Sequence, residues 1–140
     1  MLLKQDGSVW VTGKSEFGQL GDGSTNCKRR FVPVILCEVR AIAAGFDHSM
    51  VLKQDGSVWV AGKNDGGQLG SGPRTFTNTF MRVIDRGMQI VVAGGQHSMV
   101  VSADGSVWVT GSNRLGQLGD GTFTSKNTYV RIFLPRFGAC

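Results

Sequence analysis

The segment Asp55-Gly56-Ser57-Val58-Trp59-Val60 decides the fold, because it occurs three times at a fixed spacing. The same six residues stand at 6–11 and at 104–109, which is 49 residues before and after it. Gly-Gln-Leu-Gly keeps that spacing at 18–21, 67–70 and 116–119, and His-Ser-Met keeps it at 48–50 and 97–99. A tandem repeat with a period near 50 residues is typical of propellers and related arrays. Function must therefore be sought on a repeat surface.

The repeat divides the 140 residues into one array with units 1–49, 50–98 and 99–140. Met1 aligns with Met50, and Cys140 aligns with Ile42 inside an apolar run. Neither terminal unit shows the distinct capping sequence that repeat arrays normally need to cover their stacking faces. We therefore expect both ends to be cut inside a unit, as in a portion of a longer array.

One complete unit is predicted to form four strands and no helix. The expected strands are 39–45, 48–53, 57–61 and 80–84. The second and third strands are joined at Asp55-Gly56, a strong hairpin signal between apolar runs. The third strand is apolar without clean alternation, so we expect burial on both faces and place Trp59 between blades. In the loop 62–72, the leucine of Gly-Gln-Leu-Gly should fill a gap between blades while the glutamine amide holds the loop.

The linked motifs Gly-x-x-His-Ser, Asp-Gly-Ser-Val-Trp and Gly-Gln-Leu-Gly-x-Gly resemble the repeat of the RCC1 (regulator of chromosome condensation) family. The resemblance covers essentially the whole chain. It implies an all-β fold of RCC1-type β-propeller blades, each a four-stranded antiparallel sheet. About three such blades would form an incomplete seven-bladed propeller. The best-known family member is a chromatin-bound exchange factor for a small Ran-type GTPase, and many other relatives are binding modules.

Two functions follow from the resemblance. Many family members carry Trp-Gly at the end of the third strand, where this chain has Thr12, Ala61 and Thr110 before the glycine. The units are also too alike for a dedicated exchange surface, and no exchange-site residue can be matched. We therefore predict a non-catalytic module for protein–protein binding or scaffolding, part of a longer propeller. The alternative is a chromatin-associated guanine-nucleotide exchange factor acting on a Ran-type GTPase.

Catalytic chemistry finds little support in the sequence. His48 and His97 are the only histidines and occupy equivalent repeat positions, so we interpret them as buried residues that hydrogen-bond to strand backbone. Gly13-Lys14-Ser15 lacks the earlier glycine of a phosphate-binding loop, since Ser8 stands there. No Cys, His or Asp cluster has metal-ligand spacing. We expect no enzyme activity, no cofactor and no metal.

Charge gives the candidate binding residues. The net charge is +5, and the equivalent stretches 24–30, 73–79 and 122–128 contain five cations and no acid. These cations are Lys28, Arg29, Arg30, Arg74 and Lys126. Equivalent loops lie on one side of a propeller, so we predict a basic edge that attracts an acidic protein surface, a small GTPase or a nucleic-acid backbone. The alternative is that these are merely solvated loops.

The remaining features bear on the compartment. Cys27, Cys37 and Cys140 lie outside the repeat motifs, and we interpret them as free thiols in a reducing environment. No stretch approaches the apolar length of a membrane-spanning helix, so no membrane partner is expected. We expect an intracellular protein, in the cytoplasm or the nucleus.

Overall fold

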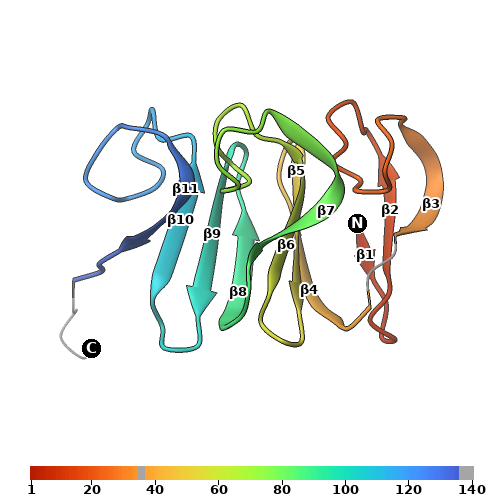
Figure 1. Cartoon of the computed structure of the whole chain (residues 1–140), viewed down its shortest axis with the longest axis horizontal. Coiled ribbons are helices and arrows are strands. Elements are labelled where there is room, and N and C mark those ends of the chain that lie inside the picture. The colour runs from red at the N-terminus through yellow and green to blue at the C-terminus, as the bar shows by residue number, and fades with distance from the viewer. Residues whose placement is uncertain (35–36, 136–140) are drawn as a thin grey trace.

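Strands paired through Asp-Gly turns make up the computed structural model, which describes residues 1–34 and 37–135. Within these residues the chain forms eleven strands in three antiparallel sheets and no helix (Figure 1). Each sheet corresponds to one sequence repeat, and we call them the first, second and third blades. The predicted all-β array of about three blades is therefore confirmed.

The second blade contains all four strands in the order β4-β5-β6-β7. Their bounds are Val39–Ala44, His48–Lys53, Val58–Lys63 and Phe76–Ile84. The Asp-Gly turn sets the register of β5 against β6, in which Leu52 faces Val58. Gly56 takes a φ of +80°, and its N–H donates to the Lys53 carbonyl over 3.0 Å. The Asp55 carboxylate accepts the Ser57 N–H over 2.8 Å, which closes the turn.

The first and third blades repeat this pattern. The first blade contains β1 (Leu2–Leu3), β2 (Val9–Gly13) and β3 (Lys28–Val34). The third contains β8 (Met88–Ala93), β9 (His97–Ser102), β10 (Val107–Gly111) and β11 (Lys126–Ile132). Four strands per blade are thus confirmed for the second and third blades, whereas the first blade has three within the described residues.

The fourth strand of each blade begins earlier than predicted. In the second blade it begins at Phe76 rather than at residue 80. The reason lies outside the unit: the preceding blade pairs with this part of the strand through isolated bridges at Asp22–Thr79 and Ser71–Thr128. Contacts with a neighbouring unit extend the strand, and a local sequence pattern does not register such contacts.

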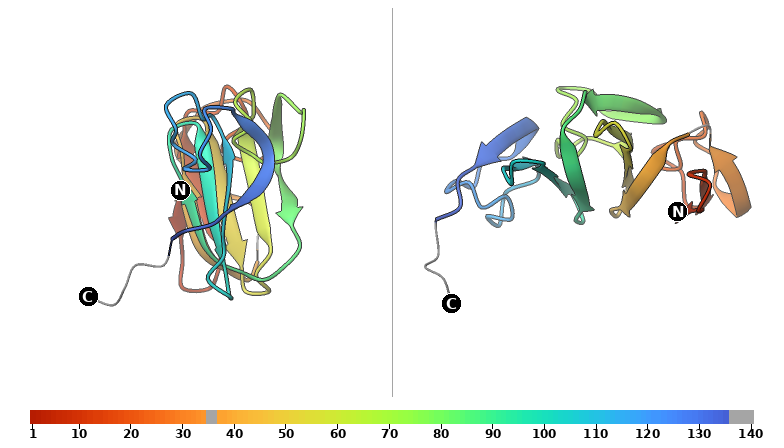
Figure 2. Two further views of the ribbon diagram at one scale, coloured as in Figure 1. Left: turned by 90° about the vertical axis from the view of Figure 1, so that its left-hand side faces the viewer. Right: turned by 90° about the horizontal axis from the view of Figure 1, so that it is seen from below.

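The three blades stand side by side along an arc (Figure 2). The first strands β4 and β8 lie on its concave side, and the fourth strands β3, β7 and β11 lie on its convex side. The long loops that follow β2, β6 and β10 gather at the upper edge of the molecule in Figure 1, and the Asp-Gly turns lie at the lower edge. The order of strands within each unit therefore fixes which loops can form a common surface.

Apolar side chains fill the two boundaries between blades. At the first boundary the buried residues are Val9, Val11, Leu20, Val34, Val39 and Val51. At the second boundary they are Met50, Leu52, Val58, Val60, Leu69, Val91 and Val100. Leu20 and Leu69 come from Gly-Gln-Leu-Gly, so the prediction that this leucine fills a gap between blades is confirmed. Each core is shared by two repeats, which is why the units need one another.

Trp59 occupies the first boundary but is less buried than predicted. It packs against the first core cluster while remaining only partly buried. Its indole N–H donates to the Ser57 hydroxyl over 3.0 Å, and the Lys53 ammonium lies 4.8 Å from the ring centroid. The ring therefore covers the outer rim of the apolar core, and its polar edge remains near the surface.

Candidate binding groove

Two of the repeat motifs meet across each boundary between blades. The Ser49 hydroxyl donates to the carbonyl of Gln19 over 2.7 Å, and Ser98 donates to the carbonyl of Gln68 over 2.6 Å. In both cases the serine of His-Ser-Met in one blade binds Gly-Gln-Leu-Gly of the preceding blade. These buried bonds hold the long upper loops in fixed positions, so the surface above them is preorganised.

The two histidines differ from the sequence interpretation. His48 is buried as expected, but its Nε2 lies 2.9 Å from the Ser98 hydroxyl of the next blade, not from strand backbone. Because the Ser98 hydrogen points to Gln68, Nε2 carries the proton that His48 donates. Burial, with a smaller contribution from nearby His97, lowers the pKa of His48 to about 4. His97 is only half-buried. The histidines are therefore structural.

The second upper loop, residues 64–75, is held from within by the Asn64 side chain. Its amide nitrogen donates to the carbonyls of Gly72 and Arg74 over 3.0 and 2.7 Å. Its amide oxygen accepts the Leu69 N–H over 2.9 Å. The Gln68 amide oxygen accepts the Gly66 N–H over 3.0 Å, which confirms that the motif glutamine holds the loop. Asn113 repeats the role of Asn64 in the third blade, whereas the first blade has Ser15.

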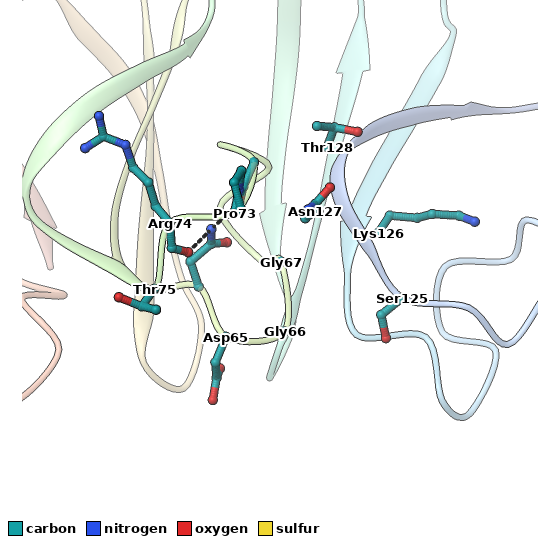
Figure 3. A pocket seen from close by; sticks show the side chains of 12 residues that line it. Asp65, Gly66, Gly67, Pro73, Arg74, Thr75, Ser125, Lys126, Asn127 and Thr128 are labelled. Carbon is teal, nitrogen blue, oxygen red and sulfur yellow. Dashed lines mark hydrogen bonds between the residues drawn. The ribbon is translucent and has the colours of Figure 1, made fainter.

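A groove of about 550 Å³ lies between this loop and the start of β11. One wall is formed by residues 64–67 and 72–75, and the other by residues 125–128. Figure 3 shows Arg74 and Lys126 on opposite sides, with their charged ends pointing away from one another. Glycine backbone, Pro73 and polar side chains such as Asn127 line most of the groove. This lining suits an extended polar segment better than a compact apolar ligand.

The five predicted cations do not form one cluster. Lys28, Arg29 and Arg30 lie on β3 of the first blade, Arg74 lies in the second loop, and Lys126 begins β11. Four of the five are therefore strand residues, and the prediction that they are loop residues is wrong except for Arg74. The starts of β3 and β11 and the loop that carries Arg74 nevertheless share the upper edge of the molecule (Figure 1).

Two of the cations have acidic partners that sequence reasoning missed. The Lys28 ammonium lies 3.0 Å from the Asp22 carboxylate, and Lys126 lies 3.5 Å from Asp120. Burial alone would raise the pKa of Asp22, but hydrogen bonds from Lys28 and Ser24 outweigh it and hold that pKa below its usual value. Hydrogen bonds from Thr122, with further help from Asn113 and Lys126, likewise lower the pKa of Asp120.

A signal in the repeat could have revealed these pairs. The first and third units have aspartate and lysine six residues apart, at 22 and 28 and at 120 and 126. The second unit replaces both, with Ser71 and Thr77. Charges that appear and disappear together at two repeat positions indicate a contact within the unit. The exposed cations of the edge are then Arg29, Arg30 and Arg74.

Other kinds of site are not indicated. Among the described residues, no group of three His, Cys, Asp or Glu side chains could hold a metal ion. Cys27 and Cys37 are free and exposed, and Cys140 lies outside the described residues. The part of the chain with described structure contains no helix long and apolar enough to cross a membrane. The groove and the arginine-bearing edge beside it thus remain the candidate site.

Comparison with known families agrees with the repeat geometry. Two models, both described as the regulator of chromosome condensation (RCC1) repeat, match residues 6–52 in one case and residues 39–68 and 89–117 in the other. Together they cover more than half of the chain. This chain belongs to the RCC1 repeat family. The RCC1 resemblance of its three linked motifs is thereby confirmed, while no curated protein sequence matches the chain.

Solved structures with RCC1-type propellers share the fold. Prp20p from Saccharomyces cerevisiae, described with its binding to Gsp1p and histones, matches 94% of this chain with a TM-score of 0.86 and 22% identity. Yeast RCC1 (Prp20) bound to Kap60 matches with a TM-score of 0.84 and 22% identity, again over 94% of this chain. Human WBSCR16 matches 89% of this chain with a TM-score of 0.75 and 24% identity. The chain spans about a third of the length of each, 34–35%.

Proposed function

We infer that this chain is a non-catalytic RCC1-type module that binds an acidic segment of a partner protein along its upper edge. The observation that carries the proposal is the set of exposed arginines Arg29, Arg30 and Arg74 beside a groove with a fixed polar lining. Guanidinium groups suit carboxylates because they offer paired donors in a planar fork. Repeat propellers of this kind present extended rigid surfaces, and such surfaces favour protein partners.

The loop anchors support this role. Asn64 and the Ser98–Gln68 bond hold the groove wall without any ligand, so little ordering entropy is lost when a segment binds. Lys28 and Lys126 contribute less to attraction, since Asp22 and Asp120 already neutralise them. The three arginines are consequently the residues whose removal should weaken binding most.

A fluorescent ten-residue glutamate-rich peptide is the probe for this proposal. Replacing Arg29, Arg30 and Arg74 together with alanine should weaken binding by roughly tenfold or more, as expected for three exposed charge contacts. Arg86→Ala is the matched control, because Arg86 is exposed but lies between β7 and β8, away from the groove. Equal losses in both variants would reduce the effect to net charge and would contradict the proposal.

The exchange-factor alternative rests on one observation. The structural neighbour Prp20p is described by its binding to Gsp1p and histones, and this chain shares its fold over part of its length. Release of labelled GDP from a Ran-type GTPase, measured with and without the chain, tests the alternative directly. Acceleration of release would favour exchange. Binding of a DNA duplex but not of the acidic peptide would instead assign the arginines to nucleic acid, with a salt slope that falls by about 0.9 per lost phosphate contact.

A further inference from the structure

The same three-residue segment is held in the same way at both boundaries between blades. Asn78-Thr79-Phe80 of the second blade lies against Gly21-Asp22-Gly23 of the first, and Asn127-Thr128-Tyr129 of the third lies against Gly70-Ser71-Gly72 of the second. The Gly23 N–H donates to the Asn78 carbonyl over 2.8 Å, and the Gly72 N–H donates to the Asn127 carbonyl over 2.9 Å. Each pair thus adds a short antiparallel bridge.

Glycine is required on the receiving side by close approach. A Cβ placed on Gly21 would overlap the Phe80 ring, and a Cβ on Gly70 would overlap the Tyr129 ring. A Cβ on Gly18 would overlap the backbone of Asn78. The motif Gly-Gln-Leu-Gly-x-Gly therefore forms a cradle in which the last three residues receive an extended strand. The second glycine of the motif makes room for the aromatic ring.

The third blade has this cradle empty among the described residues. We call Gly116, Gly119, Asp120 and Gly121 the third cradle; its glycines have φ values of +76°, +66° and +81°, close to those of the two filled cradles. A Cβ on Gly119 or Gly121 would meet nothing within 4 Å in the described part of the chain. No described residue accepts the Gly121 N–H, whereas the equivalent Gly23 and Gly72 both donate to a neighbouring strand.

The third cradle is already in its binding shape. The Asn113 amide donates to Asp120 over 3.0 Å and to the Thr122 carbonyl over 2.9 Å, and its oxygen accepts the Leu118 N–H over 3.0 Å. Asn64 makes the corresponding bonds to Gly72 and Leu69 in the filled second cradle. Because the same anchor sets the loop with and without a neighbour, the cradle does not depend on its occupant for its form.

We propose that the third cradle binds an extended segment of a partner protein with the pattern Asn-Thr-aromatic. The asparagine carbonyl accepts the Gly121 N–H, and the aromatic ring lies on Gly119. Main-chain pairing supplies part of the affinity and the ring supplies specificity, as in other cases where a peptide adds a strand to an open edge. This surface is separate from the groove, so the inference does not rest on the proposed function.

A labelled peptide with the sequence of residues 125–131, Ser-Lys-Asn-Thr-Tyr-Val-Arg, is the probe. Fluorescence anisotropy should show saturable binding to the full chain. The same peptide with alanine in place of tyrosine should bind at least tenfold more weakly, as should a scrambled peptide. Equal binding of all three peptides, or no saturable binding up to millimolar concentration, would overturn the proposal. These comparisons leave the protein unaltered, so folding cannot confuse them.

A protein variant locates the site. Gly119→Ala places a methyl group where the ring should lie and should reduce binding at least tenfold. Gly105→Ala is the matched control, because Gly105 also has a positive φ (+82°) and open space, but it lies in the turn between β9 and β10. Equal effects of the two substitutions would overturn the assignment to the third cradle.

A second copy of the chain is the competing occupant. In the first blade, Arg29-Arg30-Phe31 stands at the position of Asn-Thr-aromatic, and Phe31 is 51% exposed. Sedimentation that shows a dimer abolished by Phe31→Ala, together with failure of the peptide to bind, would assign the cradle to self-association and refute the peptide proposal. A monomer that binds the peptide is the expected result.

Discussion

The two boundaries between blades are built from nearly the same sequence but hold their blades together differently. The first boundary carries charge at its rim, where the Asp47 carboxylate lies 3.3 Å from the Lys14 ammonium and accepts the Gln19 amide over 3.4 Å. The second has Gln96 at the Asp47 position and carries a buried neutral relay from His48 through Ser98 to Gln68. Repeats therefore share an apolar core while individual substitutions choose the polar bonds. The first boundary should respond to salt and the second to pH.

The largest effect should come from the shared apolar core. Leu69→Ala removes a side chain with no exposed surface from the second boundary and should lower the free energy of unfolding by about 2–5 kcal/mol. Leu20→Ala at the first boundary should cost a similar amount. Leu115→Ala is the control, since Leu115 is 87% exposed and its loss should be close to zero. Denaturant titrations check this, and a small effect of Leu69→Ala would show that the blades do not depend on the boundary.

Acid should weaken the second boundary. The pKa of His48 falls from 6.5 to about 4 on folding, so the folded chain binds fewer protons than the unfolded chain between these values. The free energy of unfolding should therefore fall as the pH drops from about 6.5 to about 4, by roughly 3 kcal/mol. Protonation would place a hydrogen on buried Nδ1, which has no acceptor among the described residues.

Two variants isolate this titration. His48→Gln should remove most of the pH dependence of stability between pH 4 and 6.5, as followed by thermal melts. His97→Gln changes the equivalent residue of the third blade, whose ring has no Ser98-like partner within the described residues, and should leave that dependence in place. An unchanged pH profile in His48→Gln would show that carboxylates alone govern acid stability.

A single hydroxyl should distinguish the two boundaries on a smaller scale. The Thr110 hydroxyl lies 2.8 Å from the Gly67 carbonyl across the second boundary and 3.0 Å from the Lys126 carbonyl within its own blade. At the first boundary Ala61 has no such donor. Thr110→Val should lower the free energy of unfolding by about 1 kcal/mol or somewhat more. Thr12→Val, which loses only the bond to Lys28, should cost less in the same chemical denaturation experiment.

The smallest effect should come from the charged rim of the first boundary. Asp47→Asn removes the ion pair with Lys14, which is half exposed and therefore weak. The melting temperature should fall by about 2–4 °C at most in dilute buffer, and the difference should shrink as salt rises toward 1 M. Gln96→Asn changes the equivalent position at the second boundary and serves as the control. A salt-independent difference would contradict an electrostatic origin.

The candidate site was only partly predictable from the sequence. Repeat alignment correctly placed Lys28, Arg29, Arg30, Arg74 and Lys126 at equivalent positions, since equivalent residues of a repeat take equivalent places. It did not show that Asp22 and Asp120 neutralise two of them, because these acids lie just outside the basic stretches. The groove was not predicted either. It forms from two units about 60 residues apart in the chain, and no single repeat contains both of its walls.

The sequence by itself determined the number of units, the order of strands and the position of each Asp-Gly turn. These follow from local rules: apolar runs of strand length, and turn residues that accept a positive φ. Only the tertiary structure decided which side chains meet across a boundary. His48 binds Ser98, which is one period further along, and β7 begins at Phe76 because the preceding blade pairs with it. Such contacts depend on how far one blade is rotated against the next, and that rotation is set by packing rather than by any local pattern.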